Sequence, residues 1–127
     1  MKGVTTLGSS SIFEYLYRDG GNFKTHGQLR LDGWDENAEG KIRLCLEWGD
    51  QFVAEQVGVP PLCRKHWESV GEGPSDLDHA FHELVCVRQA TEGDRNLPVW
   101  GSLDTMVSRM QAAARAWNVT LSPNCDL

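Results

Sequence analysis

The densest group of side chains that could do chemistry lies between residues 76 and 83. Its imidazoles and carboxylates are Asp76, Asp78, His79, His82 and Glu83. Neutral imidazole and carboxylate suit Zn²⁺ or another divalent transition ion, and a catalytic site needs about three protein ligands plus an open position for water. One hypothesis is therefore a small metal-dependent hydrolase or nuclease, with His79, His82 and Glu83 as the catalytic candidates.

The spacing of these residues argues against a shared metal site. His79 and His82 lie on one face only if the segment is helical, because residues three apart in a strand point to opposite sides. His-x-x-His-Glu also differs from the zincin motif, in which the histidines are four apart on a helix. For residues 79–88 we expect a strand with Phe81, Val85 and Val87 on one face, and a helix is the alternative.

The cysteines could add metal ligands to this group of imidazoles and carboxylates, but their spacing matches no known metal-site motif. Cys63 and His66 form a Cys-x-x-His pair that could join Asp78, His79 and His82 around a metal, but a structural zinc site usually shows two such pairs. We therefore expect no cofactor, with zinc or another divalent metal as the alternative. Neither a disulfide framework nor a thioredoxin motif is indicated by the spacing of the four cysteines, which are Cys45, Cys63, Cys86 and Cys125.

A second group of candidates is suited to binding rather than to catalysis. Exposed aromatic side chains beside an arginine are typical of protein-binding hot spots. The predicted binding set combines such residues on a hairpin with an acidic loop, and it consists of Tyr15, Tyr17, Arg18, Asp19, Asp76 and Asp78. The alternative is a half-buried sheet face whose aromatic rings pack against a helix.

The hairpin itself is predicted from two β-prone segments around a turn. Residues 12–18 are rich in aromatic and other β-prone residues, and residues 23–31 alternate, with Phe23, Thr25, Leu29 and Leu31 on one face. The residues between them, Asp19-Gly20-Gly21-Asn22, tolerate the positive φ angles of tight turns.

Two helices are expected to cover this sheet. Asp35 can cap a helix over residues 36–48, and Ser102 can cap a second one. The second helix has an apolar stripe of Leu103, Met106, Val107, Met110, Ala113, Ala114 and Trp117. Between the helices, residues 51–59 predict a strand or extended edge, and residues 64–78 predict an exposed loop with a short helix around Trp67.

The whole chain is expected to form one α+β domain. Its 127 residues are 40% hydrophobic, which suits a single core. The fold class is a small, mostly antiparallel sheet, with the hairpin plus one or two further strands, covered by two helices. Residues 12–121 make up the domain, residues 1–11 a flexible lead-in and residues 122–127 a tail.

Charge and hydropathy limit the partners. The net charge of −6 gives no electrostatic footprint for nucleic acid, so no direct contact with nucleic acid is expected. No apolar run reaches the length of a membrane span or a signal peptide, so we expect no membrane contact and a cytoplasmic location.

Three segments carry a family resemblance. They are Tyr-Leu-Tyr-Arg-Asp at residues 15–19, Gln-Val-Gly-x-Pro at residues 56–60 and Asp-His-x-aromatic-His-Glu at residues 78–83. In this order they resemble a family of short uncharacterised bacterial proteins. The resemblance implies a bacterial origin and brings no activity with it.

The absence of a strong catalytic motif favours a non-enzymatic role. We expect an interaction or accessory module of a bacterial, phage or plasmid system, because small acidic proteins of mobile elements share this profile. Its partner would be another protein.

Overall fold

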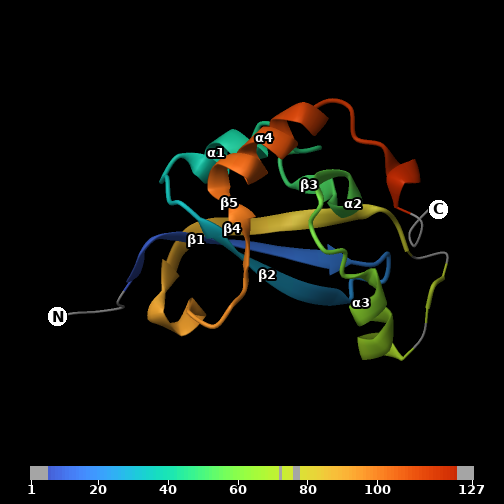
Figure 1. The fold of residues 1–127 in the computed structure, drawn as a ribbon. Helices are drawn as coiled ribbons and strands as arrows, with labels where there is room; N and C mark the ends of the chain where they lie inside the picture. The colour runs from blue at the N-terminus through green and yellow to red at the C-terminus, as the bar shows by residue number, and fades with distance from the viewer. Residues whose placement is uncertain (1–5, 72, 76–77, 123–127) are drawn as a thin grey trace.

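The computed structural model describes residues 6–71, 73–75 and 78–122. These residues form a five-stranded sheet, and three helices pack on one face of the sheet (Figure 1). The strand order is β3-β4-β1-β2-β5. Neighbouring strands are antiparallel except β2 and β5, which are parallel. The strands are β1 Thr6–Arg18, β2 Lys24–Asp32, β3 Gln51–Val53, β4 Phe81–Thr91 and β5 Val99–Ser102. The α+β prediction is confirmed, but the sheet is mixed and has three strands beyond the hairpin.

The predicted hairpin is confirmed, with its turn at the expected residues. Tyr17 pairs with Thr25, and Arg18 pairs with Lys24. Asn22 has a φ of 70°, which asparagine tolerates better than most residues. Phe23 lies in the turn rather than in β2, and 63% of its surface is exposed, so its predicted place on the apolar face is wrong.

The ends of the domain extend beyond the expected bounds. Part of the predicted lead-in, residues 6–11, belongs to β1, and Ser11 is fully buried and donates a hydrogen bond to the Gly33 carbonyl. Ser122, assigned to the tail, is also buried and donates to Glu55. Residues 1–5 and 123–127 lie outside the described residues.

The prediction of a strand over residues 79–88 is confirmed from Phe81 onward, but its two faces are not continuous. Glu14 pairs with Cys86 and Tyr15 pairs with Leu84, so Val85 is an extra residue in a β-bulge. An extra residue reverses the alternation of side chains, because the period of a strand is two. Leu84 and Val87 are therefore both buried, and Val85 is exposed.

The helices are α1 Ala38–Arg43, α2 Ala54–Val57, α3 Cys63–Val70 and α4 Leu103–Ala113. Helix α1 ends at Arg43, five residues before the predicted end at residue 48. Beyond Arg43 the chain forms tighter turns, in which the Cys45 amide donates to the Ile42 carbonyl and the Leu46 amide donates to the Arg43 carbonyl. The predicted segment 51–59 divides into β3 and α2. The short helix expected around Trp67 is confirmed as α3.

Helix α4 begins as predicted. The Ser102 hydroxyl accepts a hydrogen bond from the Thr105 amide at 3.0 Å, and Leu103, Met106, Met110 and Ala113 are buried. Trp117 lies beyond the end of the helix, so its predicted place on the helical stripe is wrong. Its ring still packs on Phe52, with ring centroids 6.5 Å apart.

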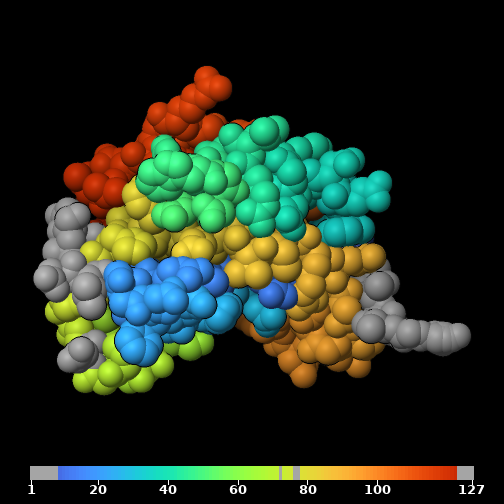
Figure 2. Space-filling model, turned by 180° about the vertical axis from the view of Figure 1, so that it is seen from behind, coloured from blue at the N-terminus to red at the C-terminus, as the bar shows by residue number. Residues whose placement is uncertain are grey.

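The core lies between the sheet and α1, α2 and α4, while α3 lies at the hairpin end of the molecule (Figure 1). Seen from behind, the hairpin turn lies against α3 (Figure 2). No helix among the described residues is long and apolar enough to cross a membrane.

Candidate functional site

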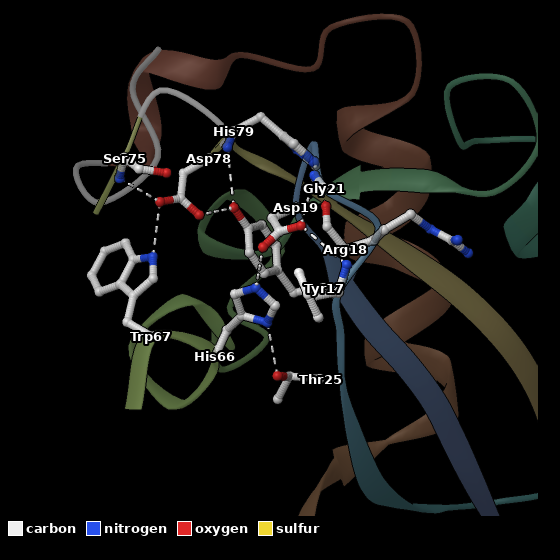
Figure 3. Close-up of polar contacts among 11 residues, drawn as sticks. Tyr17, Arg18, Asp19, Gly21, Thr25, His66, Trp67, Ser75, Asp78 and His79 are labelled. Carbon is white, nitrogen blue, oxygen red and sulfur yellow. Dashed lines mark hydrogen bonds and ion pairs between the residues drawn. The ribbon is translucent and has the colours of Figure 1, made fainter. Parts of the chain in front are cut away.

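A pocket of about 370 Å³ lies where the β1–β2 turn meets α3 and the residues before β4. The turn contributes Asp19 and Phe23, and β2 begins with Lys24 beside them. Helix α3 contributes His66 and Trp67, and Asp78 comes from the segment before β4. Residues far apart in sequence therefore meet at one end of the sheet. Figure 3 shows Asp78 and His66 on either side of Tyr17, each directed at partners from other elements.

Three donors among the described residues hold the Asp78 carboxylate. One oxygen accepts from the Tyr17 hydroxyl at 2.5 Å, and the other accepts from the Trp67 indole N–H at 2.9 Å and from the Ser75 amide at 2.8 Å (Figure 3). The Tyr17 hydroxyl in turn accepts from the His79 amide at 3.2 Å. Asp78 thus fixes the Trp67 ring against the end of β1.

A second chain of hydrogen bonds joins the turn to α3 and β2. His66 Nε2 lies 2.9 Å from Asp19 Oδ2, and its Nδ1 lies 2.9 Å from the Thr25 hydroxyl (Figure 3). The other Asp19 oxygen accepts from the amides of Gly21 at 2.8 Å and Phe23 at 3.1 Å. The same carboxylate therefore shapes the turn and anchors α3.

These contacts keep both carboxylates ionised. Burial by itself would raise the pKa of Asp78, but hydrogen bonds from Tyr17, Ser75 and Trp67 outweigh it and lower the pKa below its ordinary value. The pKa of Asp19 is lowered in the same way, because donation by His66 and by the turn amides outweighs burial. Burial, followed by the bond to Asp78, raises the pKa of the Tyr17 hydroxyl.

The hydrogen bonds between Asp19 and His66 and between His66 and Thr25 resemble a catalytic triad of acid, base and nucleophile. The Thr25 hydroxyl, in the nucleophile position, is nevertheless buried and out of reach of a substrate. Thr25 is 7% exposed and does not line the pocket, and His66 is 1% exposed. A substrate at the pocket would not reach the hydroxyl oxygen. The arrangement therefore serves to hold the hairpin and α3 together.

The structure directs the predicted catalytic residues to different partners. His79 Nε2 lies 2.6 Å from the Arg18 carbonyl, whereas His82 Nε2 accepts from the Leu62 amide at 2.9 Å. Glu83 forms an ion pair with Arg18 at 2.8 Å. Asp76 lies outside the described residues. The centroids of both histidine rings lie 5.3 Å from that of the Tyr17 ring, but His79 precedes β4, and the ring nitrogens of the two residues bond to different partners rather than to a shared position.

The other metal candidates are also committed elsewhere. Cys63 is disulfide-bonded, contrary to the expectation from cysteine spacing, while Cys45 and Cys86 are free. His66 is held by Asp19 and Thr25. In the part of the chain that the structure describes, no three His, Cys, Asp or Glu side chains are grouped so as to hold a metal ion.

The predicted binding set is divided in the same way. Tyr15 and Tyr17 are 2% and 0% exposed, and their hydroxyls bond to the Pro60 carbonyl and to Asp78, so these two rings are not exposed on the hairpin. These rings instead pack in the core, which was the alternative. Asp19 and Asp78 do meet at the pocket, and Arg18 lies outside it with Glu83.

Sequence reasoning did not single out Phe23 or Trp67 as binding residues, although both line the pocket. Phe23 was assigned to a strand face and Trp67 to a loop helix, and nothing in their spacing connects them. The one local signal for Phe23 is an aromatic residue next to a turn rich in Asp and Gly, where an apolar side chain is expected to be exposed. Comparisons with protein-family models, with curated proteins and with solved structures found no match.

Proposed function

We propose that this protein is a non-enzymatic interaction module that holds a partner protein at the pocket between the β1–β2 turn and α3. The observation that carries the proposal is the exposed ring of Phe23 at the edge of this pocket. A large apolar side chain in an exposed turn stabilises no core, whereas aromatic residues at the centre of an interface supply much of its binding energy.

The polar groups around the pocket support binding rather than catalysis. The Asp78 and Asp19 carboxylates, the Tyr17 hydroxyl and His66 each hold another part of the fold through hydrogen bonds. A surface that is fixed in this way is organised before a partner arrives, which reduces the entropy lost on binding. The partner would belong to the bacterial, phage or plasmid system that the sequence suggests.

The test compares two exposed apolar residues. The partner recovered with the wild-type protein is titrated against Phe23→Ala and against Leu121→Ala, a substitution on the C-terminal 3₁₀ turn Val119–Leu121. We expect Phe23→Ala to weaken binding by about tenfold or more, as truncation of an interface hot spot does, and Leu121→Ala to leave the affinity unchanged. Equal affinities for both variants would place the partner elsewhere on the surface.

A further inference from the structure

Neither carboxylate at the pocket has a lysine or arginine as an ion-pair partner in the part of the chain that the structure describes. In the described part of the chain, Asp78 accepts hydrogen bonds from a phenol, an indole and a backbone amide, and Asp19 forms an ion pair with His66. Among the described residues, no lysine or arginine forms an ion pair with either carboxylate, although the Arg18–Glu83 and Arg88–Asp94 pairs show that this fold forms such bridges elsewhere. The pocket therefore keeps two negative charges on its polar side.

The described lining further includes two aromatic rings and a lysine, beside the small residues Ser69, Val70 and Ser75. Phe23 and Trp67 line the pocket, and aromatic rings attract ammonium and guanidinium groups. Lys24 lines it as well and is exposed, so it offsets part of the negative charge without bonding to either carboxylate. Carboxylates beside aromatic rings form a site that suits an organic cation better than an anion.

We propose that this pocket takes the ammonium or guanidinium group of a lysine or arginine side chain from a basic segment of the partner. The inference rests on the function proposed above and names the chemistry that the partner must present. Asp19 and Asp78 supply the charge, and Phe23 and Trp67 contact the alkyl chain and the cationic head. The net charge of −6 on the whole chain also attracts a basic segment.

The first measurement uses the purified full chain and three small probes. The Trp67 indole N–H is followed by NMR while N-acetyl-lysine methylamide, the arginine analogue and the uncharged norleucine analogue are added separately. We expect the two cationic probes to shift this signal in a saturable, salt-sensitive way and the norleucine probe to leave it unchanged. Equal binding of the norleucine probe would overturn the proposal.

The second measurement uses charge variants that spare the hydrogen-bond networks. Lys24→Glu adds negative charge at the pocket, and Lys65→Glu makes the same change on α3 at a residue that does not line it. We expect Lys24→Glu to raise the affinity for the cationic probes by about three- to tenfold, as exposed ion pairs allow. Lys65→Glu should change this affinity by less than about twofold. Weaker binding of the cationic probes to Lys24→Glu than to the wild-type protein would overturn the proposal.

The two proposals can fail separately. If Phe23→Ala loses the partner but no cationic probe binds, the interaction surface stands and the cation chemistry is wrong. If the probes bind as expected but the partner does not respond to Phe23→Ala, the pocket is a cation site and the proposed partner surface is wrong.

Discussion

His82 shows how a single residue can look catalytic in a sequence and serve the core in the structure. It is fully buried, with ring centroids 5.3 Å from Tyr17 and 6.1 Å from Tyr15. Its Nε2 accepts a hydrogen bond from the Leu62 amide, which requires that nitrogen to be unprotonated. Burial lowers the pKa of His82 from 6.5 to about 4, against a smaller opposing effect of the Ala80 backbone.

This pKa predicts a pH dependence of stability. Because the unfolded chain takes up a proton on His82 near pH 6.5 and the folded chain resists it until about pH 4, stability falls as the pH is lowered through this window. We expect His82 to account for a loss of about 2 kcal/mol in the free energy of unfolding between pH 8 and pH 5. Urea melts at both pH values measure this loss in the wild-type protein.

The control for that experiment is His82→Gln, which does not titrate in this range. The difference between the free energies of unfolding at pH 8 and pH 5 should shrink by about 2 kcal/mol in the variant, whatever its stability at pH 8. Identical pH dependence in the two proteins would show that His82 is not buried in its neutral form.

At the scale of elements, α4 illustrates a helix whose start is specified locally. Ser102 has an extended backbone, and its hydroxyl caps the Thr105 amide. The cap satisfies one of the amides that have no partner within the first turn of a helix. The buried face of α4 then holds it on α1 and α2.

Removing the cap should cost stability without altering the core. We expect Ser102→Ala to lower the free energy of unfolding by about 1 kcal/mol, because the Thr105 amide loses its acceptor. Ser108→Ala, at an exposed position within the same helix, is the matched control and should have an effect of less than about 0.5 kcal/mol. Denaturant melts of the two variants decide the matter, and equal midpoints would contradict the role of the cap.

At the scale of the whole molecule, Trp117 joins the C-terminal segment to the middle of the chain. Its indole N–H donates to the Cys45 carbonyl at 2.9 Å, and its ring packs on Phe52 at the edge of the sheet. The residue is half-buried and lies beyond the end of α4, where Ala114 has left the helical conformation with a ψ of 130° and Arg115 has a φ of 64°. Trp117 therefore acts through tertiary contacts rather than through the helix.

These contacts predict a large effect for one residue near the end of the domain. We expect Trp117→Ala to lower the free energy of unfolding by about 2–4 kcal/mol, through lost packing and an unpaired Cys45 carbonyl. Arg115→Ala, at an exposed position two residues away, should cost less than about 0.5 kcal/mol. If Trp117→Ala unfolds at the wild-type denaturant midpoint, the C-terminal segment does not pack as described.

Local chemistry in the sequence determined the hairpin, the strand after His79 and the start of α4. Asp19-Gly20-Gly21-Asn22 can form the turn without help from elsewhere, and Ser102 caps a helix through a bond three residues away. The alternating aromatic residues of β1 require a strand with one apolar face. These features depend on neighbours in the chain, so pattern and propensity are sufficient to predict them.

Long-range contacts decided the rest. Strand β5 has only four residues and exists because it pairs with β2, and α1 ends where the chain must turn back toward β3. The pocket brings together Phe23, His66 and Asp78, and their spacing in the sequence does not indicate that they lie close together in the fold. The burial of Tyr17 and His82 likewise follows from which face of the sheet the helices cover. Such outcomes depend on the free energy of the whole packed core, which no local segment of sequence expresses.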